Sequence, residues 1–286
     1  MIKKPKIGIM QGRLSKQQGD KIQTFPISSW EQEFEQASKY GFEVIQWLFD
    51  DLKNPIFQNE EISNIISIIK KYDIKVNSVC ADYFMSQKLF SESEDNISKN
   101  LQVLAKLIRQ CHKLDISMIE IPLVDSSSMK TADEKSEFKN NLEKFVPLIE
   151  ELGVALGLET DLPPQDFRDL LLEINHPQIL ANYDSGNSAS LGYDPIEELH
   201  MLKDWIKNIH IKDRKLHGIT VPFGTGDTNF DHFFSTLTGI NYFGDLIIQG
   251  ARNKQKNISP TQTCIEYQRF VDKYVNKYYT PSVSLR

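Results

Sequence analysis

Four polar residues, each at or near the carboxyl end of a short apolar segment, could together hold a divalent metal ion. Glu159 ends VALGLE, Asp184 ends ILANYD, His210 lies in WIKNIHI and Gln249 ends DLIIQ. Carboxylate, imidazole and amide donors in one set suit Mn²⁺, Mg²⁺, Co²⁺ or Zn²⁺ and leave coordination positions open for substrate oxygens. Each residue alone has an ordinary structural explanation, since buried polar side chains are usually hydrogen-bonded. The metal site is therefore predicted from the four residues together.

Eight such apolar segments, mostly rich in Ile and Val and too short for helices, are predicted to be buried strands. They are KIGIM (6–10), EVIQW (43–47), KVNSVC (75–80), SMIEIP (117–122), VALGLE (154–159), ILANYD (179–184), WIKNIHI (205–211) and DLIIQ (245–249). Amphipathic stretches alternate with them and are predicted to be helices. These stretches are 30–41, 60–72, 97–114, 132–152, 164–174, 194–204, 229–238 and 262–277.

Alternating strands and helices fit two α/β folds, an open doubly wound sheet and a closed (β/α)₈ TIM barrel. Eight repeats with no leftover segment favour the barrel, as a single domain over residues 1–286. The segment after the first strand, MQGRLSKQQGD, also lacks the GxGxxG pattern of nucleotide-binding sheets.

The carboxyl ends of the strands meet at one mouth of such a barrel, and the reactive residues stand there. Polar residues at or just after these ends are therefore predicted to contact the substrate: Gln11, Arg13, Gln46, Asp82, Lys212, Arg214 and Arg252. Several of them are cations on loops of a chain with net charge −6, which indicates an anionic substrate such as a phosphorylated sugar. The run after the seventh strand could instead be a solvated loop in which Asp213 pairs internally. The long segments 14–29 and 213–228 are predicted to act as lids.

Composition excludes several other classes of protein. The 286 residues include 33 Lys and Arg against 39 Asp and Glu, and the pI is near 5.6, so no general basic field attracts nucleic acid or anionic lipid. Cys80, Cys111 and Cys264 are far apart and form no CxxC pair, which argues against a disulfide framework. The start MIKKPKIGIM lacks an apolar signal region, and no segment approaches the length of a membrane span. A cytoplasmic protein is expected.

Several motifs resemble the xylose-isomerase-like TIM-barrel family of sugar-phosphate isomerases and epimerases, which also includes inosose dehydratases and endonuclease IV. The motifs are IGIMQGRLS, YDSGNSASLGYDP, HIKDR and VPFGTGDTNFD, and they are most similar to members described as hexulose-6-phosphate-isomerase-like. The resemblance implies a metal held by Glu159, Asp184 and His210, with Gln249 where a second glutamate is usual. It also implies that Gln46 replaces a common glutamate and that Asn187 replaces a histidine of some branches, which makes Asn187 a further candidate for substrate binding. Relatives are commonly dimers or tetramers, so a homo-oligomer is consistent with the resemblance.

The resemblance implies a sugar or sugar-phosphate isomerase or epimerase in which Glu159 moves a proton through a metal-stabilised enediolate. Gln249 cannot act as a base, which favours one-base isomerisation over two-base epimerisation unless Glu120 or Asp82 substitutes. An inosose-dehydratase-like lyase and a catalytically degenerate sugar-binding barrel are the alternatives. A DNA-repair nuclease is disfavoured, because its additional histidines and a basic surface are missing.

Overall fold

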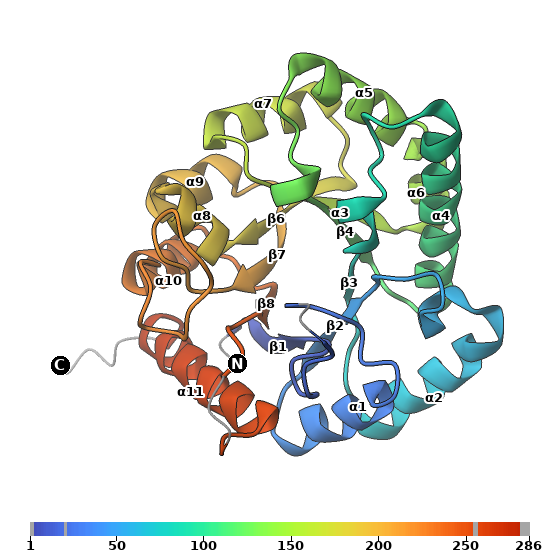
Figure 1. Cartoon of the computed structure of the whole chain (residues 1–286). Coiled ribbons are helices and arrows are strands. Elements are labelled where there is room, and N and C mark those ends of the chain that lie inside the picture. The colour runs from blue at the N-terminus through green and yellow to red at the C-terminus, as the bar shows by residue number, and fades with distance from the viewer. Residues whose placement is uncertain (1–2, 20–21, 254–256, 281–286) are drawn as a thin grey trace.

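The computed structural model describes residues 3–19, 22–253 and 257–280. Its eight strands pair in parallel, each with its neighbour in sequence, and β1 pairs with β8 to close the barrel (Figure 1). The strands are β1 (Lys6–Met10), β2 (Val44–Leu48), β3 (Ser78–Cys80), β4 (Met118–Leu123), β5 (Ala155–Thr160), β6 (Ile179–Asp184), β7 (Ile206–Ile211) and β8 (Asp245–Ile248). The predicted (β/α)₈ barrel is confirmed.

Helices surround the barrel on the outside (Figure 1). They are α1 (Trp30–Lys39), α2 (Ile62–Tyr72), α3 (Tyr83–Ser86), α4 (Glu94–Lys113), α5 (Ala132–Glu143), α6 (Val146–Leu152), α7 (Pro164–Ile174), α8 (Ser185–Leu191), α9 (Pro195–Leu202), α10 (Phe230–Gly239) and α11 (Pro260–Tyr278). Capping residues start several of them; for example, the side chain of Ser259 accepts a hydrogen bond from the Gln262 N–H at the start of α11. In the described part of the chain, no helix is both long and apolar enough to cross a membrane.

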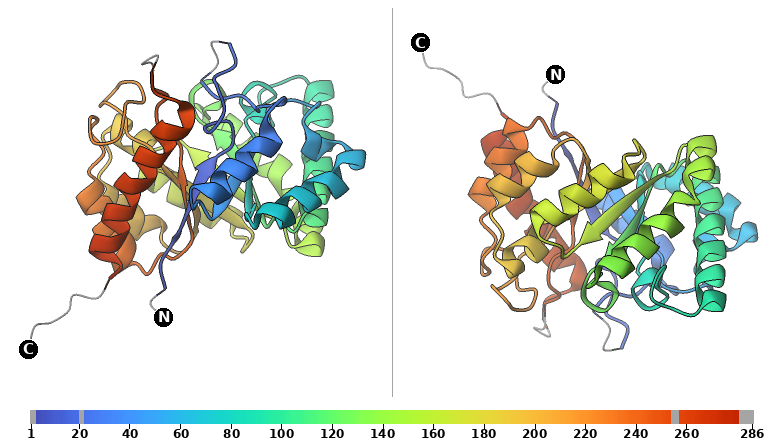
Figure 2. Two further views of the ribbon diagram at one scale, coloured as in Figure 1. Left: turned by 90° about the horizontal axis from the view of Figure 1, so that it is seen from below. Right: turned by 90° about the horizontal axis from the view of Figure 1, so that it is seen from above.

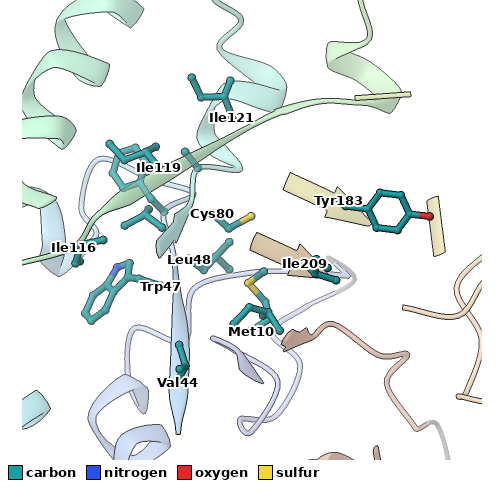
Figure 3. Close-up of a cluster of buried hydrophobic side chains, with 14 of the residues drawn as sticks. Met10, Val44, Trp47, Leu48, Cys80, Ile116, Ile119, Ile121, Tyr183 and Ile209 are labelled. Carbon is teal, nitrogen blue, oxygen red and sulfur yellow. The ribbon is translucent and has the colours of Figure 1, made fainter. Parts of the chain in front are cut away.

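Strand side chains alternate between the lumen and the helical layer, because successive residues of a strand point to opposite faces. On β2, Gln46 bonds across the lumen to His210 of β7, so Trp47 beside it must face outward. Trp47 packs there against Trp30 and Phe34 of α1. Figure 3 shows Trp47 within a cluster of buried hydrophobic side chains. The outward faces of the strands therefore supply the core, while the lumen near the carboxyl ends is polar.

Two helical predictions differ from the structure. The predicted helix 132–152 forms two helices, α5 and α6, which are separated at Lys144 and Phe145. Pro147 causes the break, since it has no N–H to continue the hydrogen bonding of α5. The short helices α3 and α8 were not predicted; α8 begins where the Asp184 carboxylate accepts the N–H groups of Gly186 and Asn187.

Asp213 organises the long loop between β7 and α10. Its buried carboxylate accepts the backbone N–H groups of Gly224 and Gly226 at 2.8 and 2.9 Å and that of Thr228 at 3.2 Å. The segment 213–228 is thus tied to the end of β7. Of the other predicted lid, 14–29, residues 20 and 21 lie outside the described residues. A lid function for either segment stays a prediction.

Candidate active site

His210 lies at the centre of the polar lumen and is completely buried. Its Nε2 is 2.7 Å from Gln46 Oε1 and 3.0 Å from Glu120 Oε2. Its Nδ1 is 3.0 Å from Glu159 Oε2 and 3.7 Å from Asp184 Oδ2. Burial opposes protonation, but the charge of Glu120 and hydrogen bonds to the surrounding carboxylates raise the pKa of His210 well above its usual value. One imidazole therefore joins side chains from β2, β4, β5 and β6.

Glu159 is held by two amides. Asn182 donates to its Oε2 at 2.8 Å, and Asn187 donates to its Oε1 at 2.7 Å. Arg214 in turn donates to the Asn187 oxygen at 2.8 Å, which fixes the orientation of that amide. Burial, followed by the negative charge of Glu120, raises the pKa of Glu159 to about 7. A carboxyl group with such a pKa can both accept and release a proton near neutral pH.

Asp184 ends β6 and remains ionised. Its Oδ1 caps α8, and its Oδ2 lies 2.6 Å from the Lys212 Nζ. Burial alone would raise the pKa of Asp184, but the positive charge of Lys212 and the contact with His210 lower it well below its usual value. Lys212 thus balances one of the negative charges that the lumen gathers.

Glu120 is the residue whose place in the site the sequence prediction underrated. It is almost fully buried on β4, accepts from Gln46 Nε2 at 2.9 Å and from the Cys80 thiol at 3.5 Å, and contacts His210. Asn182 was missed altogether. Its signal was available, because Asn182 precedes Asp184 by two residues and so shares its face of the strand.

Gln249, Asp82 and Arg13 meet at Gln23, a residue of the loop after β1. Gln249 Nε2 and Arg13 Nη2 donate to Gln23 Oε1 at 3.0 and 2.9 Å, while Gln23 Nε2 donates to Asp82 at 2.8 Å. Gln23 was not predicted, since no strand pattern indicates which loop residue folds back. Among the described residues, the buried Gln249 Oε1 has no hydrogen-bond partner.

The side chains of Gln11 and Arg252 form hydrogen bonds with backbone groups in this structure. Gln11 Oε1 accepts the Leu48 N–H at 3.1 Å at the end of β2. Arg252 donates to the carbonyl oxygens of Gly12 and Ser15 at 2.7 and 2.9 Å. Both side chains are engaged by backbone groups, so substrate binding by them stays a prediction.

The lumen suits a divalent cation. Ligand atoms of Glu120, Glu159 and His210 all lie within 4.8 Å of one another, and all three residues are buried. With its raised pKa, His210 carries protons on both ring nitrogens here; to bind a metal through Nδ1, the ring would lose that proton and keep the one on Nε2, which lies 2.7 Å from Gln46 Oε1. A histidine ligand is usually oriented in this way, by a second acceptor on its other nitrogen. Gln249 lies outside this group and contacts Gln23; its buried Oε1 has no donor within the part of the chain that the structure describes.

Comparisons with known proteins identify the family to which this barrel belongs. The family described as "Xylose isomerase-like TIM barrel" matches residues 34–266. L-ribulose-5-phosphate 3-epimerase UlaE of Salmonella paratyphi A is 25% identical over 232 residues, covering 77% of this chain and 81% of that protein. A solved L-ribulose 3-epimerase superposes with a TM-score of 0.77 at 16% identity and covers 96% of this chain and 95% of its own. A zinc-bound IOLI protein also gives 0.77, at 15% identity, with 96% and 100% covered. The chain belongs to the xylose isomerase-like TIM barrel family.

Proposed function

We propose that this chain is a divalent-metal-dependent isomerase or epimerase of a sugar or sugar phosphate, with Glu159 as the base. The observation that carries the proposal is the convergence of Glu159 Oε2 and Asp184 Oδ2 on His210 Nδ1, at 3.0 and 3.7 Å, inside a closed barrel. The related UlaE is named as a 3-epimerase of L-ribulose-5-phosphate, which supports a ketose phosphate as substrate.

The metal ligands would be Glu159, Asp184 and His210, with Gln249 contributing its amide oxygen. A divalent ion such as Mn²⁺, Mg²⁺, Co²⁺ or Zn²⁺ would supply a Lewis acid that polarises a substrate carbonyl. Because Gln249 is neutral, this set carries one negative charge fewer than a set with a second glutamate. We therefore expect weaker metal binding than in a Gln249→Glu variant, as measured by titration of the metal-free protein with Mn²⁺.

Glu159 would remove the proton next to the carbonyl. Asn182 and Asn187 hold both of its carboxyl oxygens, so the group is positioned before substrate arrives. Glu159 is only 5% exposed, so burial keeps water from competing for the same carboxylate. Lys212, which is 2.6 Å from Asp184, would supply a positive charge beside a developing oxyanion.

The role of Glu120 would determine whether the site catalyses 3-epimerisation in addition to isomerisation. Isomerisation needs one base that returns the proton on the same face, whereas 3-epimerisation needs a second acid or base on the opposite face. Gln249 cannot provide it, and Glu120 is the remaining carboxyl beside His210 in the predicted site. We propose one-base isomerisation through Glu159, with epimerisation dependent on Glu120.

The test is proton exchange in D₂O. Purified protein loaded with each of the four metals is incubated with ketopentose 5-phosphates, and deuterium incorporation and products are followed by NMR. Glu159→Gln should lower the exchange rate at least about 10³-fold. Glu120→Gln should abolish epimerisation and spare isomerisation, while the exposed Glu150→Gln serves as control. Full exchange in Glu159→Gln would refute its role, and no exchange with any metal would refute the activity.

A cytoplasmic location and a homo-oligomeric state are retained as further proposals from the sequence. Size-exclusion chromatography with light scattering would test the second.

A further inference from the structure

A small cavity lies outside the lumen, between the barrel wall and α11. Its volume is about 80 Å³, and Arg13, Arg252, Thr263 and Tyr267 are among its lining residues. Figure 2 shows the loop after β1 and the first turn of α11 side by side at the end of the barrel opposite both termini. Because one water-sized sphere needs roughly 15 Å³ of such space, the cavity accommodates about the five heavy atoms of a phosphate group.

Arg13 lines this cavity and has one side-chain N–H group without a hydrogen-bond acceptor among the described residues. The side chain belongs to a residue that is only 8% exposed, and its Nε has no hydrogen-bond partner among the described residues. Its other nitrogens donate to neutral oxygens, those of Gln23 and of the Ile22 backbone. A buried guanidinium with a free N–H is costly unless an acceptor completes it.

Arg252 places a second cation beside the first. All three of its donor groups contact neutral backbone carbonyls, and within the described residues no carboxylate lies within ion-pair distance of either arginine. Burial and then the positive charge of Arg252 lower the pKa of Arg13 to about 10. The nearby Glu33 offsets only part of this charge at neutral pH, because burial raises its pKa to about 7 and leaves it about half ionised there. Arg13 and Arg252 together therefore carry positive charge that an anion bound in the cavity would neutralise.

α11 contributes the positive end of its dipole. Pro260 and Thr263 in its first turn line the cavity, and the whole helix is 19 residues long and ends at Tyr278. Gly250 lets the Tyr267 ring pack directly against the backbone of the wall, since a Cβ there would lie 2.4 Å from the ring. Two cations, a helix N-terminus and Thr263, whose hydroxyl donates to the Ser259 carbonyl oxygen at 3.3 Å in this structure, thus surround one cavity.

We propose that this cavity is a subsite for a tetrahedral oxyanion, the phosphate group of a phosphorylated sugar. The assignment as a substrate subsite rests on the proposed function; the anion site itself does not. Gln23 connects the two regions, because it accepts from Arg13 on one side and from Gln249 on the other. Binding of the phosphate would therefore set the position of the sugar relative to the lumen.

The first test uses inorganic phosphate and the metal-free, full-length protein. Isothermal titration calorimetry should show binding with a Kd in the millimolar range, weakened at least about tenfold in Arg252→Gln. The control is Arg109→Gln, which removes an exposed arginine from α4 and should leave phosphate binding unchanged. If Arg252→Gln does not fold, Thr263→Val replaces it and should weaken binding about threefold. No binding to the unmodified protein, or equal binding in every variant, would overturn the proposal.

The second test separates a substrate subsite from a site for free phosphate. In the active enzyme, phosphate should compete with ketose phosphate, and Arg252→Gln should raise the KM for the phosphorylated ketose at least about tenfold more than the KM for the free ketose. Non-competitive inhibition would overturn the assignment to the substrate. Phosphate binding without any sugar turnover would instead refute the proposed function and leave the anion site standing.

Discussion

Removal of the Asp213 carboxylate should loosen the whole loop between β7 and α10. The carboxylate accepts three backbone N–H groups and is only 1% exposed. Hydrogen bonds to a charged acceptor contribute about 1.5–3 kcal/mol each, but such contributions do not add fully. We expect Asp213→Ala to lower the free energy of unfolding by about 3–5 kcal/mol, and Asp213→Asn, which keeps the size and loses the charge, by somewhat less.

Urea unfolding at pH 7, together with limited proteolysis of the loop, measures this effect. Asp227→Ala is the matched control, because Asp227 lies on the same loop and accepts the Leu216 N–H but is 47% exposed. Its loss should cost less than about 1 kcal/mol. Equal destabilisation by the two substitutions, or less than about 1 kcal/mol for Asp213→Ala, would refute the assignment of loop order to Asp213.

Two further changes test packing and ionisation. Gly226→Ala should destabilise by more than about 2 kcal/mol, since its Cβ would lie 2.0 Å from Asp213 Oδ1, whereas Gly239→Ala, with open space around it, should stabilise slightly. Burial raises the pKa of Glu198 to about 7 from 4.5, so the folded state holds this proton more tightly than the unfolded chain. Stability should therefore fall by up to roughly 3 kcal/mol between pH 4.5 and 7, and Glu198→Gln should flatten that decline in urea midpoints.

The barrel was predictable because each strand had a clear local signal. The predicted strands 6–10 and 179–184 coincide with β1 and β6. The predicted strand 75–80 shrinks to Ser78–Cys80, with Lys75 making one isolated bridge to Val44. α8 escaped prediction because SGNSAS contains poor helix formers, and its start depends on a cap from Asp184.

The site was predictable only as far as strand ends determine it. Glu159, Asp184 and His210 come together because β5, β6 and β7 are neighbours in the barrel. The approach of Glu120 and Gln46 to His210 depends on contacts across the lumen, which strand tilt and side-chain conformation decide. Local sequence patterns do not predict that Glu120 and Gln46 come within contact distance of His210.

Closure of the barrel also has a consequence for biosynthesis. β1 is the first strand of the barrel to be made, and its partner β8 is the last. Until then both outer edges of the growing sheet stay unpaired, and such edges favour aggregation. Truncation before Asp245 would leave the ring permanently open, so we expect premature termination products to be substrates for chaperones and proteases.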